Sequence, residues 1–166
     1  MSGSLLLVGA PAYRTTSSTS SAGAVFVFVA EPRMAFKQRI MKPGIVRSFE
    51  FFGTAVATVC MAVQHRPPVM LQVFLCSHTC LTLGGDLQHG RFAFISAYRS
   101  WFGSTMSNVG AIYIYTIGSA TLASPLVYQS VVFPPTPMTT LTYFGCSVCL
   151  FRMPLPPFLS SSLSRS

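Results

Sequence analysis

Short apolar runs separated by Gly, Pro and Ser recur along the chain, and none keeps a helical period between caps. The runs are rich in aromatic and β-branched residues, which favour strands. Residues 112–115 alternate as Ile-Tyr-Ile-Tyr, in the manner of a half-buried strand. The pattern predicts an all-β fold, with strands near residues 4–8, 24–29, 52–59, 92–96, 111–116, 126–132 and 144–150.

An internal repeat is the most informative feature of this pattern. A turn at Gly9 is followed by a Gly-Ala strand at Gly23, and the matching elements at Ser96 and Gly110 both lie 87 positions further along. A Phe-Gly dipeptide recurs with a shift of 92. Three matched elements in one order predict a β-meander unit used twice. The repeat motif comprises Gly9, Ala10, Pro11, Gly23, Phe52, Gly53, Ser96, Ala97, Gly110, Phe144 and Gly145.

The order of these elements resembles the FG-GAP repeat of the integrin alpha chain, which builds a β-propeller of stacked four-stranded sheets. The resemblance covers roughly residues 4–29, 49–59 and 91–148. It implies a partial β-propeller, with about one complete four-stranded blade and strands of the two flanking blades.

On this interpretation the chain divides into four parts. Residues 1–48 hold the end of one blade and a linker, and residues 49–133 form a blade with an unmatched insertion at about 59–90. Residues 134–150 begin a next blade, and residues 151–166, rich in Pro and Ser, are expected to form a disordered tail. The insertion matches nothing in the repeat, so a loop insertion and a frame-shifted segment both stay open.

The small number of acidic residues limits the reactions and metal sites that the chain can support. Only Glu31, Glu50 and Asp86 are acidic, against 11 Lys and Arg, and the formal net charge is +8. Catalysis by paired carboxylates is disfavoured and no Gly-x-Ser-x-Gly elbow occurs, so we expect no enzyme activity. The resembling family often carries an Asp-rich calcium loop. Because calcium needs several oxygen ligands, Asp86 alone cannot form this site, and we expect no cofactor.

Five cysteines raise the alternative of a zinc site. Cys76, His78 and Cys80 are closely spaced, and Cys146 and Cys149 form a CxxC pair. The CxxC pair falls in a predicted strand, where residues three apart point to opposite faces. Buried or disulfide-bonded cysteine is therefore favoured over a metal site.

One stretch of the chain is strongly basic. Its composition suits a nucleic-acid or anionic-membrane patch. It also suits the solvated outer strand of a blade, where Lys protects an exposed edge. The second interpretation is favoured, so no specific nucleic-acid partner is expected. The residues are Arg33, Lys37, Arg39, Lys42 and Arg47, with Phe36 and Phe49 nearby.

The resemblance implies protein binding and adhesion at the cell surface or outside the cell, with a protein ligand or partner subunit. The ligand-facing loops would be residues 13–22 and their counterpart, residues 99–109. The apolar run at residues 5–10 is too short for a signal peptide and lacks a basic start. Membrane association would therefore come through an anchor outside these residues.

Two rival interpretations belong to other classes. A degenerate or frame-shifted product would have no independent function and would aggregate through unpaired strands. A small membrane protein would span the bilayer through the uncharged residues 67–85 or 106–133. Buried strands are favoured over spans in both segments.

Overall fold

The computed structural model describes residues 5–14, 16–29, 33–61, 70–75, 80–83, 90–103, 106–118, 125–134 and 143–153. Every regular element within these ranges is a β-strand. The strands are β1 (Leu5–Ala10), β2 (Ala24–Val29), β3 (Ala35–Ile40), β4 (Phe52–Met61), β5 (Met70–Leu75), β6 (Cys80–Leu83), β7 (Gly90–Ala97), β8 (Ala111–Ile117), β9 (Leu126–Val132) and β10 (Val148–Met153).

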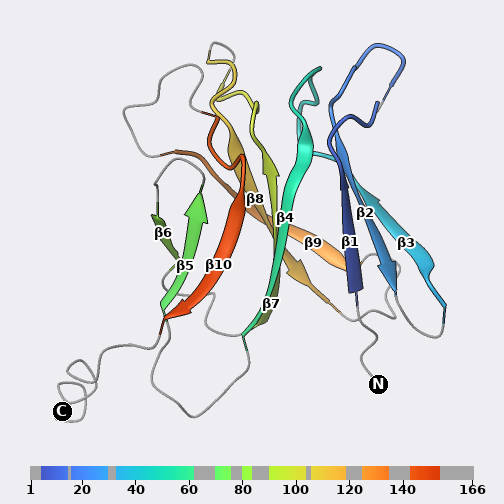
Figure 1. The fold of residues 1–166 in the computed structure, drawn as a ribbon. Helices are drawn as coiled ribbons and strands as arrows, with labels where there is room; N and C mark the ends of the chain where they lie inside the picture. The colour runs from blue at the N-terminus through green and yellow to red at the C-terminus, as the bar shows by residue number, and fades with distance from the viewer. Residues whose placement is uncertain are drawn as a thin grey trace, which may run out of the picture.

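These strands form three antiparallel sheets (Figure 1). The first sheet has the order β1-β2-β3, the second β4-β7-β8-β9 and the third β10-β5-β6. The second sheet is a complete four-stranded blade, and the described strands do not close into a ring. The predicted fold class is confirmed: the protein is all-β, a partial β-propeller with one complete blade and strands of two flanking blades.

The predicted strands of the first and second sheets agree closely with the observed ones, except that the outer strand of the first sheet was not predicted. β2 and β9 occupy the predicted residues, and most other predicted strands differ by one or two residues at an end. β3 was not among the predicted strands. It is the outer strand of the first sheet, and Lys37 and Arg39 are exposed on it. The favoured interpretation of the basic stretch, a solvated edge strand, therefore holds for residues 35–40.

Two further predictions need correction in the C-terminal half. The unmatched segment at 59–90 contains strands β5 and β6, which pair with β10 in the third sheet. The last Phe-Gly dipeptide lies before β10, because the strand begins at Val148 rather than at Phe144. β10 then runs to Met153, three residues into the predicted tail, and residues 154–166 lie outside the described residues.

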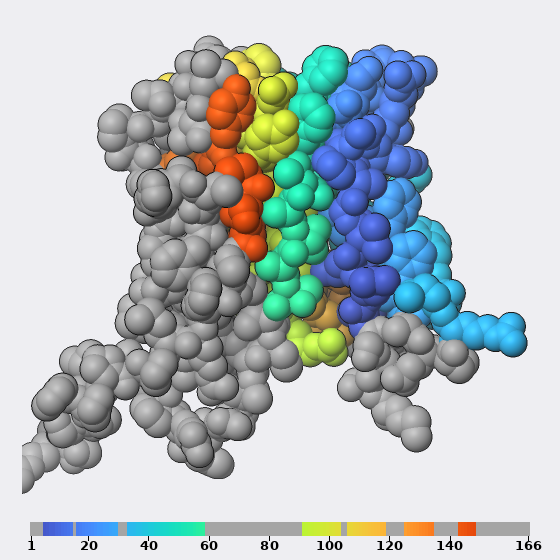
Figure 2. Space-filling model, viewed as in Figure 1, coloured from blue at the N-terminus to red at the C-terminus, as the bar shows by residue number. Residues whose placement is uncertain are grey.

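The core lies between the first and second sheets. Alternation along β1 and β2 turns one set of aliphatic side chains toward the second sheet. They pack on the facing side chains of β7 and β8, and β1 lies beside β4 (Figure 2). The cluster comprises Leu5, Leu7, Val25, Val27, Ile40, Val56, Phe52, Ala93, Ile95, Ala97, Ala111, Tyr113, Tyr115, Ile117, Leu126, Val131 and Phe133.

A side-chain amide also joins the two sheets. The Gln38 Nε2 donates to the Leu126 carbonyl oxygen at 3.2 Å, and the Leu126 amide donates to the Gln38 Oε1 at 3.1 Å. Gln38 thus satisfies both backbone groups at the start of β9, as a neighbouring strand would. This contact holds the edge strand of the first sheet against the second sheet.

In place of a spanning helix, the described residues of the segment 106–133 contain strands β8 and β9. Much of residues 67–85 lies outside the described part of the chain. No helix among the described residues is long and apolar enough to cross a membrane.

Candidate functional site

The repeat motif forms a junction between consecutive units. Gly23 has φ +89° and forms a parallel β-bridge with Phe52. The Phe52 amide donates to the Ala22 carbonyl oxygen at 3.0 Å. A Cβ atom at Gly23 would collide with the Phe52 backbone, so only glycine meets both demands at this position. The Phe52 ring is fully buried and contacts the Tyr113 ring edge-on.

A second junction has the same geometry. Gly110 has φ +85° and bridges to Phe144, whose amide donates to the Val109 carbonyl oxygen at 3.0 Å. The residues two positions before the two glycines, Ser21 and Asn108, also share a positive φ of 50° and 57°. The two spacings seen in the sequence therefore correspond to two equivalent junctions in space.

The strands behind these junctions are in equivalent contact as well. Gly9 lies against Gly53, and Ser96 lies against Gly145. A Cβ atom at Gly9 would collide with the Gly53 carbonyl oxygen, whereas the second copy has room for a serine. The Ser96 hydroxyl accepts a hydrogen bond from the Ala55 amide at 2.9 Å. One copy thus uses glycine for close approach, and the other uses a hydroxyl to bind the neighbouring strand.

The turns after β1 and β7 complete the motif. The Ala10 carbonyl accepts a hydrogen bond from the Tyr13 amide, and the Ala97 carbonyl accepts one from the Ser100 amide, both at 3.0 Å. Pro11 occupies the second position of the first turn, which suits its fixed φ. All the predicted motif residues therefore join or turn strands.

The same junctions gather several loops at one end of the sheets, the upper end in Figures 1 and 2. The Phe49 amide donates to the Ser20 carbonyl oxygen at 2.7 Å, and the Ser20 amide donates to the Ser48 hydroxyl. The described residues of both predicted ligand-facing loops, 13–22 and 99–109, lie at this end. We call it the loop end, and it comprises the described residues 11–14, 16–23, 41–51, 98–103, 106–110 and 143–147.

Arginine–aromatic pairs are the main side-chain feature of the loop end. The Arg47 guanidinium lies over the Trp101 ring, 4.4 Å from its centroid. The Arg39 guanidinium approaches from β3, lies over the Tyr13 ring and donates to its hydroxyl at 2.7 Å. Such pairs are worth about 0.5–1 kcal/mol each when exposed. They hold large flat side chains in fixed positions at the surface.

A third arginine lies among three rings from three different segments. The Arg99 guanidinium carbon is 5.3 Å from the Phe51 ring centroid, 5.6 Å from Tyr98 and 5.8 Å from Tyr143. Phe51 and Tyr143 occupy equivalent places, each directly before the Phe-Gly dipeptide, and both have a positive φ. Arg99 therefore bridges the two junctions at the surface.

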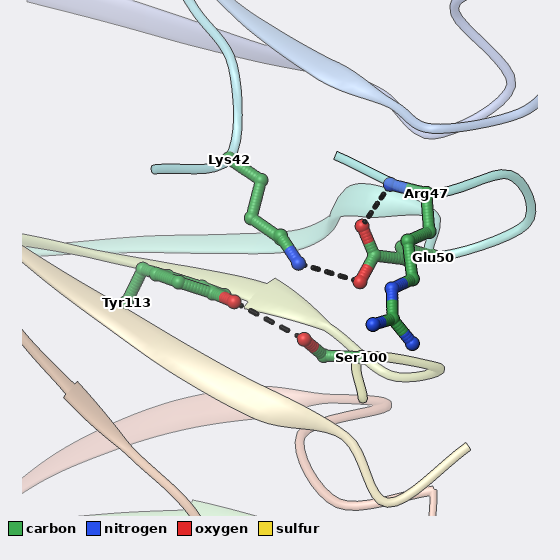
Figure 3. A network of polar contacts seen from close by, with 5 residues as sticks. All are labelled: Lys42, Arg47, Glu50, Ser100 and Tyr113. Atoms are coloured by element: carbon green, nitrogen blue, oxygen red, sulfur yellow. Dashed lines mark hydrogen bonds and ion pairs between the residues drawn. The ribbon is translucent and has the colours of Figure 1, made fainter. Parts of the chain in front are cut away.

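A buried ion pair supports the loop after β3 (Figure 3). The Glu50 carboxylate is fully buried and accepts from the Lys42 ammonium at 2.6 Å and from the Arg47 amide at 2.9 Å. Glu50 follows three residues after Arg47, so its carboxylate closes a local turn. The pair fixes the backbone that carries the Arg47 guanidinium.

A second polar pair lies beneath the loop end, also in Figure 3. The Ser100 and Tyr113 hydroxyls are 3.1 Å apart and buried. Burial raises the pKa of Tyr113 to about 12, and the nearby Glu50 carboxylate adds to this rise, while the hydrogen bond with Ser100 opposes it. Burial likewise raises the pKa of Tyr115. Both phenols are therefore neutral at physiological pH. The contact between Ser100 and Tyr113 is a hydrogen bond between two buried, uncharged hydroxyls.

Comparison with known proteins found no match. The scan against protein-family models, the search of the curated proteins and the search of the solved structures all gave this result.

The basic stretch separates into two groups in the structure. Arg33, Lys37 and Arg39 are exposed on or beside the edge strand, whereas Lys42 and Arg47 are half-buried and engaged with Glu50 or Trp101. The five basic side chains therefore do not form one continuous, solvent-exposed positive surface. Phe36 is exposed on β3, and Phe49 is exposed on the loop end.

The predicted metal-site candidates fall mostly outside the described residues. This holds for Cys76, His78 and Asp86, and for the side chains of Cys80 and Cys149. Cys146 precedes β10, so the strand argument used against the CxxC pair does not apply to it. Among the described residues, no group of three or more His, Cys, Asp or Glu side chains is close enough to hold a metal ion.

Sequence reasoning missed the residues that shape the loop end. Arg47 and Trp101 are far apart in the chain, and no local pattern connects them. Only Glu50 could have been singled out from the sequence. It follows a basic stretch and lies close to a Phe-Gly dipeptide, which is consistent with a buried ion pair.

Proposed function

We propose that this chain is a protein-binding module of the cell surface or extracellular space, which binds an acidic protein partner through the loop end. This extends the FG-GAP resemblance, which implies adhesion through loops on one face of a propeller. In this proposal the chain is not an enzyme, needs no metal and has no specific nucleic-acid partner.

The Arg47–Trp101 pair is the observation that carries the proposal. Trp, Tyr and Arg dominate the binding energy of protein interfaces, and Trp101 is the only Trp of the chain. Phe49 and Phe102 are exposed close by in sequence on the same loops, at 54% and 40%. The segment Lys42–Glu50 holds Arg47 in place, so little entropy is lost on binding.

The charge of the loop end indicates the kind of partner. Glu50 is the only acid among its described residues, and this carboxylate is neutralised by Lys42. Arg14, Arg47 and Arg99 leave the surface positive. Complementary charge raises association rates and fixes orientation, so an acidic partner surface fits best.

The experiment measures binding of the purified full chain to immobilised extracellular proteins with acidic surfaces. We expect Trp101→Ala and Arg47→Ala to weaken binding by at least about tenfold, as for central interface residues. Val127→Ala is the matched control, because Val127 is exposed on β9, outside the loop end. EDTA should leave binding unchanged.

Two outcomes would contradict the proposal. One is binding that is insensitive to Trp101→Ala and Arg47→Ala. The other is a full chain that shows no β-type circular dichroism and only aggregates, which would favour the degenerate-product alternative.

A further inference from the structure

One arginine of the loop end is surrounded by aromatic rings and lies between the two junctions. The Arg99 guanidinium carbon is 5.3 to 5.8 Å from the ring centroids of Phe51, Tyr98 and Tyr143. The rings also contact one another, since Tyr98 lies 5.3 Å from Phe51 and 5.9 Å from Tyr143, centroid to centroid. We call these four residues the Arg99 cluster. Its rings come from three segments of the chain and hold the guanidinium in one place.

The Arg99 guanidinium has no polar partner in the part of the chain that the structure describes. The one ion pair found there joins Lys42 to Glu50, so no carboxylate neutralises Arg99. The Arg99 Nε atom is buried and has no hydrogen-bond acceptor among the same residues. Glu50 directly precedes Phe51, but its carboxylate is occupied by the Lys42 ammonium and the Arg47 amide. A cation partly removed from water is costly without an anion beside it, so its position needs an explanation.

The backbone turn that carries Arg99 does not explain the arginine. Arg99 is the third residue of the turn 97–100, which is closed by a hydrogen bond from the Ser100 amide to the Ala97 carbonyl oxygen. The equivalent residue of the first copy, 87 positions earlier, is Ala12, and it is exposed. An alanine is therefore sufficient for the same turn in this protein.

Two rings of the Arg99 cluster are carried by strained backbone. Phe51 has φ +54° and Tyr143 has φ +50°, in the left-handed region that bulky residues rarely adopt. Hydrogen bonds from the Phe51 amide to the Ser21 carbonyl and from the Tyr143 amide to the Asn108 carbonyl maintain these conformations. Strain that is maintained in this way is common at binding sites. The rings are thus in place beside Arg99 before any partner binds.

We propose that the Arg99 cluster is a carboxylate-binding site, which takes one Asp or Glu side chain of the protein partner. This inference rests on the function proposed above, because it names the chemical group that the loop end recognises. Nε is the one nitrogen of the Arg99 guanidinium that is buried without an acceptor. The two Nη nitrogens are the donors left for a ligand, and their planar arrangement matches the two oxygens of a carboxylate.

The composition of the site favours a carboxylate over a phosphate. The Arg99 cluster holds one cation, which matches a single negative charge, whereas a phosphate monoester carries a charge of about −2. The surrounding rings exclude water and so strengthen an ion pair. The row of rings continues to Phe49, which is 54% exposed and 6.4 Å from Phe51. An apolar side chain next to the acid of the partner can contact this row.

The test titrates the full chain with hydrocinnamate, which carries one carboxylate and one ring. The NMR signal of the Arg99 Nε–H group, assigned through backbone correlations in isotope-labelled protein, reports on binding. We expect this signal to shift saturably, with a dissociation constant of about 1–10 mM. Uncharged hydrocinnamide should not shift it, and phenyl phosphate should bind more weakly than hydrocinnamate.

Arg99→Lys is the informative variant, because it keeps the positive charge and removes the planar pair of donors. Hydrocinnamate binding, followed through the backbone amide signals of the loop end, should weaken by at least about tenfold. Arg33→Lys is the matched control, since Arg33 is exposed beside the edge strand, outside the loop end, and binding should be unchanged. The comparison of hydrocinnamate with hydrocinnamide uses the unaltered chain and decides the point even if Arg99→Lys does not fold.

Four results would overturn the carboxylate site. The first is the absence of a saturable shift of the Arg99 signal. The second is an equal shift with hydrocinnamide, which would assign binding to the rings alone. The third is tighter binding of phenyl phosphate, which would assign the site to phosphate. The fourth is a shift of the Arg99 signal in ligand-free Glu31→Gln or Asp86→Asn, which would assign the guanidinium to an acid of the chain itself.

Failure of the carboxylate site differs from failure of the proposed function. A chain that binds acidic proteins but gives no Arg99 shift with hydrocinnamate contradicts only the carboxylate site. A chain that binds hydrocinnamate at Arg99 but no acidic protein contradicts the proposed function, and with it the assignment of the carboxylate to a protein partner.

Discussion

The two copies of the repeat share their backbone features but differ in how deeply their equivalent side chains are buried. Gly23 and Gly110, the two Phe-Gly dipeptides and the two register shifts correspond closely. Yet Leu6 and Val8 of the first copy are exposed, whereas their counterparts in the second copy, Ala93 and Ile95, are buried against the first sheet. The sequence of each copy therefore determines its local backbone geometry, whereas the neighbouring sheet determines which of its side chains are buried.

The largest expected effect comes from removing a junction ring. Phe52→Ala and Phe144→Ala should each lower the free energy of unfolding by about 3–5 kcal/mol, because both rings are fully buried. Urea unfolding followed by circular dichroism measures this loss. Phe102→Ala is the control and should cost much less, since Phe102 is 40% exposed. If only one of the two junction variants is destabilised, the two junctions are not equivalent.

Adding a methyl group at the junction should have the next largest effect. Gly23→Ala and Gly110→Ala combine an unfavourable positive φ with a collision against backbone, and we expect a loss of about 2–4 kcal/mol in the same assay. Gly103→Ala is a matched control, because Gly103 has φ +66° but open space around its Cβ position. It should lose about 1 kcal/mol. Equal losses at all three positions would show that close approach does not matter.

The buried phenol distinguishes the copies at high pH. Tyr113 stands where the first copy has Phe26, and burial raises its pKa from 10.0 to about 12. A raised pKa means that the folded state holds the proton more tightly. Stability is therefore full below pH 10 and falls as the pH rises toward 12.

The expected loss over that range is on the order of 2–3 kcal/mol, measured by urea unfolding at successive pH values. Tyr113→Phe should reduce this decline without abolishing it, because burial also raises the pKa of Tyr115. The variant should also lose about 1 kcal/mol at neutral pH through the Ser100 hydrogen bond. An unchanged alkaline decline in Tyr113→Phe would assign the decline to another group.

The smallest effect concerns the serine that replaces glycine. Ser96→Ala keeps the Cβ atom and removes only the acceptor of the Ala55 amide, so we expect a loss of about 1 kcal/mol by urea unfolding. Thr54→Ala removes a hydroxyl that is bonded to the Phe51 carbonyl on an exposed residue, and should lose less. A larger loss in Thr54→Ala would contradict the role given to Ser96.

The sequence predicted the fold where the apolar pattern was clean. β2 and β9 were placed correctly because alternating or aliphatic residues lie between clear turn signals. β3 was missed, because Lys37 and Arg39 conceal its alternation. Its equivalence to β9, shifted by 92 positions, becomes visible only when Phe28 and Tyr115 are found to pair in the same way.

Other features could not be predicted for physical reasons. The final Phe-Gly dipeptide was placed in a strand, but Tyr143 and Gly145 take positive φ and delay the strand to Val148. The loop-end pair of Arg47 and Trp101 joins residues that only the fold brings together. Burial of the second copy likewise depends on the first sheet, which no local pattern reveals.

The junction has a consequence for how the protein is made. The loop that ends at Gly23 is completed by hydrogen bonds from Phe49, Phe51 and Phe52, which emerge from the ribosome later. During synthesis, the first unit therefore stays open until the next unit begins. If translation stops after β3, the first sheet lacks these hydrogen bonds. Its unpaired strand edges are then prone to pair with other nascent chains.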